Sequence, residues 1–379
     1  MSGSPPDVVF ALTGDVRRNS RALKQLRLLA SLGYQVDILT LGPPAPDPQL
    51  EPGLRLRVLE PPTGRGPRYF WNVHRTFSQA LGAARAYHAS DLYVLPALAA
   101  AARRHGGRLV YDARERYPHV ASTAGRPWVS WVWRLIEGAY VRRADAVFTV
   151  SASIARHMAA DYGIAPPPVL HNVPPWHPVA PSTYLRDRLG LPAETTLVLH
   201  QGQMRKHRGC VRLVEAMRSV RGAALVFLGG GPLRLVLEEM AAQEQLPVYF
   251  LEAVPPDDLL AVTASADVGV TLLEDTCLNH RFALPNKLFE YLMAGLPVVA
   301  SDLPELRGVV QEHGVGVVVD PSDPQAVAAG LQRLVDDPAM RQACVARIPG
   351  VFETFSWAHA AARMTAAYRA LVPAATRSS

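Results

Sequence analysis

The sequence predicts an α/β fold of two domains, each built on a parallel β-sheet with helices on both faces. Short apolar runs alternate with helical segments in two successive sets, which is the pattern of doubly wound parallel sheets. The chain of 379 residues is also long for one hydrophobic core, because single cores stop growing beyond ~250–300 residues.

The predicted strands fall into two groups along the chain. The first group is Val8–Leu12, Val36–Thr40, Leu92–Leu95, Leu109–Tyr111, Ala146–Val150 and Val169–His171, and the second is Leu197–His200, Leu225–Leu228, Val248–Leu251, Val268–Thr271, Val298–Ala300 and Val315–Val319. Between the groups, Pro174, Pro175, Pro178 and Pro181 form a stiff linker, because proline lacks the N–H group that helices and sheets use. We therefore expect domains at residues 1–178 and 179–356, followed by a helix at about Trp357–Leu371 in a last segment, 357–379.

Residues 284–301 give the clearest indication in the sequence of a site that binds an anion. A helix is expected to begin near Pro285 and Asn286 and to stop at Gly295, since proline is tolerated in a first turn and glycine commonly ends a helix. Lys287 then lies in the first turn, where a cation opposes the helix dipole at a cost of ~0.3–1 kcal/mol. An anion such as a phosphate would remove that penalty.

Glu290 shares the helix face of Lys287. A carboxylate at this position could accept two hydrogen bonds from ribose hydroxyls while the helix dipole holds a pyrophosphate. The alternative is an ordinary ion pair between Lys287 and Glu290 on a solvated face.

Glycines and cations also follow the strands of the second half. Gly202, Arg205, Lys206 and Arg208 lie between a predicted strand and a helix, where such residues can hold a pyrophosphate or form a solvated loop. The glycines at 229–231 suggest a dinucleotide motif, but Arg234 stands where its third glycine should be. A hydride-transferring oxidoreductase is therefore disfavoured.

Polar residues follow the first-half strands in the same way. Gly14, Asp15 and Arg17 come after the first strand, where glycine allows close backbone approach and Arg17 could hold an anion. Arg114 and Glu115 follow a later strand, and Glu115 could orient Arg114 or be its surface partner. A tight turn with solvated charges is the alternative for the first set.

Taken together, these segments resemble the retaining glycosyltransferases of family 4, over nearly the whole chain. The segments that carry the resemblance are residues 14–24, 110–115, 149–154, 171–174, 201–209, 229–233 and 284–301. The last segment contains the motif Leu-Pro-Asn-Lys-Leu-Phe-Glu-Tyr, which is typical of a subgroup of the family. The resemblance implies a GT-B fold, in which two Rossmann-like domains face a cleft and the C-terminal helix crosses back to the N-terminal domain. It also implies sugar transfer from a nucleotide diphosphate sugar with retention, without a metal or another cofactor.

The resemblance assigns roles to the residues described above. Lys287 and Arg208 would stabilise the leaving diphosphate, and Glu290 would hold the ribose. The other expected donor-binding residues are Gly202, Arg205, Lys206, Gly230, Pro285 and Asn286, and the expected acceptor-binding residues of the N-terminal domain are Gly14, Asp15, Arg17, Arg114 and Glu115.

The chain departs from the family pattern at three positions. Arg114 stands where a histidine is usual, and arginine cannot exchange a proton near neutral pH. Gln203 replaces an arginine that usually follows the glycine, and Phe282 replaces the first of two paired glutamates. These departures leave the donor sugar and any catalytic role of position 114 open.

Composition sets the remaining expectations. The longest apolar run, Leu92 to Ala102, is too short to span a bilayer, and the first residues lack a secretory pattern, so we expect a cytoplasmic protein. Three isolated cysteines argue against a disulfide framework or a zinc site. No pattern typical of nucleic-acid binding is present.

Charge is uneven along the chain. Residues 1–178 hold 21 Arg and Lys against 12 Asp and Glu, a net charge of +9, whereas residues 179–379 hold 18 against 21, a net charge of −3. The basic half, with Trp128, Trp131 and Trp133 followed by arginines, is compatible with peripheral contact with the inner face of a membrane. Buried packing of the tryptophans is the alternative.

The acceptor is expected to be either a cell-envelope or lipid-linked glycan or a small natural-product metabolite. A nucleotide-sugar epimerase of the same fold and a non-catalytic partner that binds sugar nucleotides are the competing classes. The sequence leaves the donor base, the sugar, the acceptor atom and the oligomeric state open.

Overall fold

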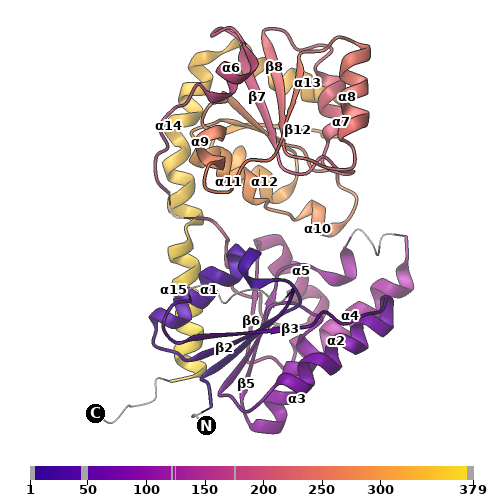
Figure 1. The fold of residues 1–379 in the computed structure, drawn as a ribbon, viewed down its shortest axis with the longest axis vertical. Helices are drawn as coiled ribbons and strands as arrows, with labels where there is room; N and C mark the ends of the chain where they lie inside the picture. Colours follow the sequence, from indigo (N-terminus) through magenta and orange to yellow (C-terminus); the bar gives the residue numbers. More distant parts are fainter. Residues whose placement is uncertain (1–4, 44–49, 121–122, 124, 175, 374–379) are drawn as a thin grey trace. The chain divides into compact units, whose positions relative to one another are not determined.

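The computed structural model describes residues 5–43, 50–120, 123, 125–174 and 176–373, and the following statements concern these residues. Pro175 of the predicted linker and the first four residues lie outside this part. The chain divides into two compact units (Figure 1). Unit 1 comprises residues 1–172 and 357–379, and unit 2 comprises residues 173–356. The boundary between the two units lies between residues 172 and 173, a few residues before the predicted boundary at residue 178.

Unit 1 contains a parallel six-stranded sheet in the order β3-β2-β1-β4-β5-β6. Its strands are β1 (Val8–Leu12), β2 (Val36–Leu41), β3 (Leu54–Leu59), β4 (Ala86–Ala89), β5 (Arg108–Ala113) and β6 (Ala146–Thr149). The helices are η1 (Val16–Arg18), α1 (Ser20–Ser31), α2 (Gly66–Ala80), α3 (Leu95–His105), η2 (Tyr117–His119), α4 (Pro127–Val141), α5 (Ala152–Tyr162) and α15 (Trp357–Leu371). Every residue of β1 is buried, as expected for a central strand covered on both faces.

Unit 2 repeats this arrangement with a parallel six-stranded sheet in the order β12-β11-β10-β7-β8-β9. Its strands are β7 (Thr196–Gln201), β8 (Ala223–Leu228), β9 (Val248–Leu251), β10 (Val268–Thr271), β11 (Val298–Ser301) and β12 (Gly316–Val319). The helices are α6 (Tyr184–Leu189), α7 (Cys210–Ala216), α8 (Arg234–Gln243), α9 (Leu259–Thr263), α10 (Leu278–Arg281), α11 (Asn286–Met293), α12 (Pro304–Val310), α13 (Pro324–Asp336) and α14 (Pro338–Phe355).

The predicted fold class is confirmed, since both sheets are parallel and doubly wound. In each unit the first strand lies in the middle, with the second and third strands on one side and the last three on the other. Strand order therefore reverses next to β1 and next to β7, and ligands of such sheets bind at the carboxyl ends of the strands beside that point.

Two strand predictions for unit 1 are wrong, and one strand was missed. The apolar run from Leu92 forms a turn and the buried helix α3, and the strand of this region is β4, which lies earlier in the chain. The edge strand β3 was not predicted at all. Val169 makes only an isolated bridge to Thr149.

The last helix, α15, has the predicted bounds and packs in unit 1 against α1. Ala360, Met364 and Tyr368 belong to the same apolar cluster as β1. The Tyr368 hydroxyl lies 2.7 Å from Nδ1 of the fully buried His88, and Tyr34 donates its hydroxyl to the Val372 carbonyl at 2.8 Å. The core of unit 1 is thus completed by the end of the chain.

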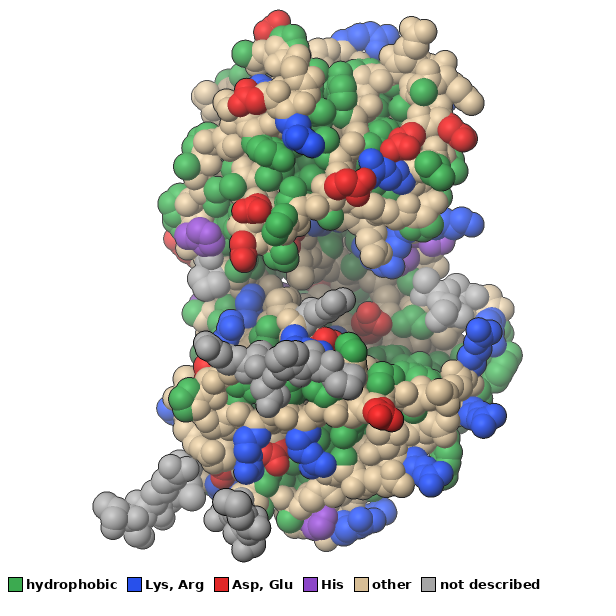
Figure 2. Space-filling model, viewed as in Figure 1, with side chains coloured by type: hydrophobic (Ala, Val, Ile, Leu, Met, Phe, Trp, Pro, Cys, Tyr) green, Lys and Arg blue, Asp and Glu red, His purple; other side chains and the backbone are tan. Residues whose placement is uncertain are grey.

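No helix among the described residues is long and apolar enough to cross a membrane. Figure 2 shows blue Lys and Arg side chains around much of the visible face of the unit that carries α1 to α5, with fewer red side chains between them. This distribution agrees with the basic charge of the first half of the sequence.

Candidate functional site

A cavity of about 620 Å³ lies in unit 2 at the carboxyl ends of β7 and β8. It extends to the first turn of α11, whose N-terminus has no side-chain cap. The lining includes six residues of the predicted donor site, namely Gly202, Gly230, Pro285, Asn286, Lys287 and Glu290. Residues from distant parts of unit 2 therefore meet at the edge where a parallel sheet binds ligands.

Lys287 is half-buried in the first turn of α11 and forms no ion pair with any described residue. The alternative of a solvated Lys287–Glu290 ion pair is therefore not what the structure contains. Burial lowers the pKa of Lys287 to about 8, and the neighbouring charge of Arg208 acts in the same direction. An uncompensated cation of this kind would be stabilised by a bound anion.

Glu290 is held by Gln201 instead. The Gln201 side-chain amide donates a hydrogen bond to the Glu290 carboxylate, and its carbonyl oxygen accepts one from the Thr263 hydroxyl at 2.9 Å. Burial raises the pKa of Glu290, while the Gln201 hydrogen bond opposes that shift. Gln201 begins the segment 201–209 that contributes to the family resemblance, but the sequence assigned it no role, and Thr263 was not identified from the sequence.

The glycines of the β8–α8 loop allow two backbones to lie in contact. A Cβ atom on Gly229 would lie 2.4 Å from the Gly202 carbonyl oxygen, and one on Gly231 would lie 2.3 Å from the Met204 carbonyl oxygen. The Met204 amide also donates to the Gly230 carbonyl at 2.9 Å. A Cβ atom added to Gly230 would meet no other atom within 4 Å, and Gly230 lines the cavity.

Arg205, Lys206 and Arg208 lie on the loop between β7 and α7, but they are not among the described residues that line the cavity. Burial and the nearby charge of Arg205 lower the pKa of Arg208. The positive charge of Arg205 thus lowers the pKa of Arg208, and that of Arg208 lowers the pKa of Lys287. A bound anion would relieve this repulsion between cations.

A second buried layer lies behind Lys287. His200 is fully buried, and its Nε2 lies 3.7 Å from the Cys210 sulfur. Burial, together with the charges of Lys287 and Arg208, holds the pKa of His200 well below its usual range. His200 is therefore a neutral neighbour that adds no positive charge behind Lys287.

The predicted acceptor residues lie in unit 1, at the carboxyl edge of its sheet. Arg17 is already paired with Asp15, at 2.8 and 2.9 Å from the two carboxylate oxygens. Gly14 follows β1 closely, and a Cβ atom added to it would meet no other atom within 4 Å. Arg17 is therefore a neutralised cation, in contrast to Lys287.

Arg114 differs from its predicted environment. β5 ends at Ala113, and the Arg114 guanidinium lies 3.7 Å from the buried carboxylate of Asp91. Glu115 is exposed and forms no ion pair with any described residue, so it neither orients Arg114 nor pairs with it. Asp91 also accepts hydrogen bonds from the Thr13 backbone and hydroxyl, at 2.7 and 2.9 Å. Asp91 was not identified from the sequence.

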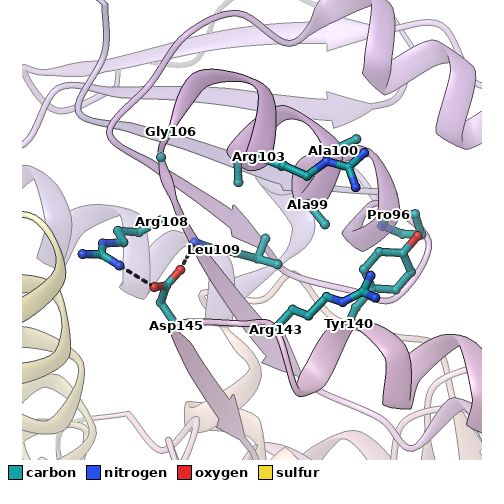
Figure 3. Close-up of a pocket in the computed structure, with 12 residues that line it drawn as sticks. Pro96, Ala99, Ala100, Arg103, Gly106, Arg108, Leu109, Tyr140, Arg143 and Asp145 are labelled. Carbon is teal, nitrogen blue, oxygen red and sulfur yellow. Dashed lines mark hydrogen bonds and ion pairs between the residues drawn. The ribbon is translucent and has the colours of Figure 1, made fainter.

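Another cavity, of about 530 Å³, lies in unit 1 away from all predicted site residues (Figure 3). It is formed by one side of α3, the start of β5 and the end of α4. Arg108 there is paired with Asp145 at 2.8 Å, while Arg103 and Arg143 flank an apolar floor. Its position at the amino edge of the sheet separates it from the carboxyl edge, where Gly14 and Arg114 lie.

Two family models match the chain. The model described as a glycosyl transferase 4-like domain matches residues 19–176, and the model described as glycosyl transferases group 1 matches residues 182–349. The chain belongs to the GT-B glycosyltransferases of family 4. This glycosyltransferase is similar to D-inositol 3-phosphate glycosyltransferase of Corynebacterium glutamicum (strain R), with 29% identity over 197 residues, which are 48% of this chain and 45% of that protein. The chain spans about half the length of the curated relatives it matches.

Solved structures show the same fold over nearly the full length of the glycosyltransferase. Sucrose-phosphate synthase from Thermosynechococcus elongatus has a TM-score of 0.76 at 19% identity, with 96% of this chain and 98% of that chain covered. Anabaena HepE in complex with UDP and glucose has a TM-score of 0.72 at 16% identity, with 96% and 99% covered. At these identities the likeness supports the fold, and the roles of individual residues stay predictions.

Proposed function

We propose that the glycosyltransferase moves a sugar from a nucleotide diphosphate sugar to an acceptor, with retention of anomeric configuration. The observation that carries this proposal is the unit 2 cavity, where Lys287 has no carboxylate partner among the described residues and Glu290 is oriented by Gln201. A cation without a partner at an uncapped helix N-terminus suits a diphosphate, and an oriented carboxylate suits the ribose hydroxyls.

In the proposed reaction, the bond between the anomeric carbon and the diphosphate oxygen breaks while the bond to the acceptor oxygen forms on the same face. The leaving phosphate takes the acceptor proton. Lys287 and Arg208 stabilise the negative charge that grows on the diphosphate, which is transition-state electrostatic stabilisation. These two cations supply positive charge, so we propose that the transfer step requires no metal.

Arg205, Lys206, Gly202, Gly230, Pro285 and Asn286 complete the proposed donor site. Gly230 lines the cavity with open space at its Cβ position, and Lys287 lies in the first turn of α11, whose N-terminus has no side-chain cap. The similar HepE structure holds UDP and glucose, so UDP-sugars are the first donors to test.

We propose that the acceptor binds at the carboxyl edge of the unit 1 sheet, where Gly14, Asp15, Arg17, Arg114 and Glu115 lie. Arg114 is the cation best suited to an anionic acceptor group, because its partner Asp91 is 3.7 Å away and Arg17 is already neutralised. The proposed acceptor is either a cell-envelope or lipid-linked glycan or a small natural-product metabolite. The similar Corynebacterium protein is named for D-inositol 3-phosphate.

Helix α4 supports peripheral contact with a membrane. Trp128, Trp131 and Leu135 are 63, 61 and 52% exposed, and their spacing places them on one stripe of the helix. Arg126 lies over the Trp128 ring at 5.7 Å. Trp133 points the other way and packs against Phe70, so buried packing applies to only one of the three tryptophans. Arginines beside exposed tryptophans fit an anionic lipid surface of the cytoplasmic leaflet.

The experiment that tests the proposed function is a thermal-shift panel of UDP-, GDP-, ADP- and TDP-sugars, with and without EDTA. A ligand that binds only the folded state raises stability by RT ln(1 + [L]/Kd). We expect a shift with one class of nucleotide that EDTA does not remove, and loss of that shift in Glu290→Gln and Glu290→Ala. Full transfer activity of Glu290→Ala with unchanged donor affinity would contradict the residue assignment.

Product analysis separates the competing classes. Release of nucleoside diphosphate that depends on the acceptor supports transfer, whereas a changed donor sugar without an acceptor indicates an epimerase. Donor binding with no turnover against lipid-linked and soluble acceptors indicates a non-catalytic partner.

A further inference from the structure

Two histidines and an aspartate of unit 1 meet in a place that the proposed reaction does not use. His157 and Asp161 lie one turn apart on α5, and His119 ends the short helix η2. One ligand atom from each of these residues lies within 4.8 Å of the other two, and all three side chains are half-buried. Two imidazoles and a carboxylate are ligands typical of zinc and neighbouring transition metals.

The charges around Asp161 leave one carboxylate in excess. The fully buried Arg116 donates to Glu137 at 2.6 Å and also to Asp161, so two carboxylates share one buried guanidinium. Tyr111 and Tyr162 donate their hydroxyls to Glu137 at 2.9 and 2.6 Å, which satisfies that carboxylate further. Of the two carboxylates that share Arg116, Asp161 therefore carries the negative charge that is not compensated.

Arg134 is the cation that now lies near this excess charge. Its guanidinium is 3.6 Å from Asp161 Oδ1, and its side chain is 54% exposed. An exposed, flexible arginine at this distance contributes little and can turn into solvent. Asp161 can therefore exchange Arg134 for another cation without breaking its contact with buried Arg116.

An ion can reach Asp161 from solvent. A cavity of about 280 Å³ is lined by Asp161 and Tyr162 of α5 and by Trp131, Arg134, Leu135, Gly138 and Arg142 of the α4 region. Two of these lining side chains, Trp131 and Leu135, are exposed. The path passes Arg134, the side chain that would have to move.

We propose that His119, His157 and Asp161 bind a divalent transition-metal ion, with Zn²⁺ as the best fit and water in the fourth position. Bonds of about 2.0–2.1 Å place tetrahedral ligand atoms about 3.3 Å apart, so side-chain rotations must close the present spacing by about 1.5 Å or less. The ion would join η2 to α5 and so fix the segment that follows Arg114. The isolated cysteines argued against a zinc site, but the ligands proposed here are histidines and a carboxylate.

The test is Zn²⁺ titration of the metal-stripped full chain by calorimetry, with Co²⁺ absorption in the visible range as an independent probe of coordination. We expect one site per chain, and a loss of affinity of more than ~100-fold in His119→Ala and in His157→Ala, since even outer-shell changes cost about 10–100-fold. His105→Ala, which removes an exposed histidine at the end of α3, should bind as the unchanged protein does. Arg134→Ala should bind more tightly, because it removes the competing cation.

The thermal unfolding transition of each variant serves as the folding control, because the proposed metal site lies in unit 1 and UDP binding to the unit 2 cavity would not report on it. No Zn²⁺ or Co²⁺ binding at millimolar concentration by a chain with a cooperative unfolding transition would overturn the proposal. Unchanged binding by the His119→Ala, His157→Ala double variant would also overturn it, and so would weaker binding by Arg134→Ala.

Discussion

At the scale of single residues, Lys287 has an unusual environment for a lysine. Burial lowers the pKa of its ammonium group to about 8, and the positive charge of Arg208 lowers it as well. A bound diphosphate would stabilise the ammonium form and raise that pKa. The affinity for UDP should therefore be full below pH 8 and fall as the pH rises through and above about 8, by up to about tenfold per pH unit.

This pH dependence is measurable by calorimetric titration of UDP between pH 7 and 9.5. The phosphate groups of UDP, with second ionisations near pH 6, carry a constant charge over this range. Lys287→Met should bind UDP weakly and lose the slope above pH 8. A slope that persists in this variant would assign the titration to another group.

Gln201 gives a second residue-scale prediction. Its amide connects Thr263 to Glu290, so Gln201→Ala should leave Glu290 without its orienting donor. We expect donor affinity to fall about 10–100-fold, as for the loss of an outer-shell partner, with a stability loss of about 1 kcal/mol. Thr263→Val, which keeps the Gln201–Glu290 bond, should have the smaller effect on donor affinity in the same titration.

The residues of the candidate site were only partly predictable from sequence. Lys287 and Glu290 follow from helix periodicity and the position of a helix start, which are local properties. Gln201 and Asp91 depend on contacts between segments that are far apart in the chain, as the Gln201–Glu290 separation of 89 residues illustrates. No local pattern encodes such a contact.

At the scale of elements, the β8–α8 loop makes a prediction with a matched control. Gly231 has φ of +150° and its Cβ position lies 2.3 Å from a backbone oxygen, whereas Gly230 has open space. Gly231→Ala should lower the free energy of unfolding by about 2–4 kcal/mol through strain and displaced backbone. Gly230→Ala should change stability by less than about 1 kcal/mol while weakening UDP binding. Chemical denaturation checks both, and equal losses would contradict the contact between the two loops.

Elements were predicted well where burial on both faces leaves a continuous apolar run, as in β8. Edge strand β3 has the alternating sequence Leu-Arg-Leu-Arg-Val-Leu, and that period of two was a usable signal for a half-exposed strand. β4, with the sequence Ala-Tyr-His-Ala, has no β-branched residue and is a strand because its neighbours β1 and β5 pair with it. Tertiary context decided that element.

At the scale of the whole molecule, buried histidines make stability depend on pH. His88 is fully buried between Phe10 and Tyr368, and burial lowers its pKa from 6.5 to about 4. The unfolded chain therefore binds this proton first, so the contribution is present above about pH 6.5 and is lost as the pH falls toward 4. The loss from this group is about 3 kcal/mol.

Urea unfolding between pH 7 and 4.5 tests this expectation. His88→Phe keeps a ring against Phe10 but has no titrating group, so its stability should fall less steeply with acid than that of the unchanged chain. Tyr368→Phe, which keeps His88, should retain the steep fall. Parallel pH profiles for His88→Phe and the unchanged chain would assign the acid sensitivity elsewhere.

The two-domain plan was predictable because length and two strand–helix sets are global properties of the sequence. The linker prolines located the change of unit to within a few residues. The pairing of His88 with Tyr368, which are 280 residues apart, depends on where the chain returns, and local sequence carries no information on that.

The return of α15 to unit 1 has a consequence for how the protein is made. Residues 173–356 form one uninterrupted stretch and can fold as soon as they leave the ribosome, whereas unit 1 needs Met364 and Tyr368, which are synthesised after all of unit 2. The N-terminal part of unit 1 is therefore synthesised first, but part of its apolar core stays uncovered until α15 has been synthesised. A nascent chain that stops before Trp357 would leave that core open to chaperones and proteases, even though its donor cavity is complete.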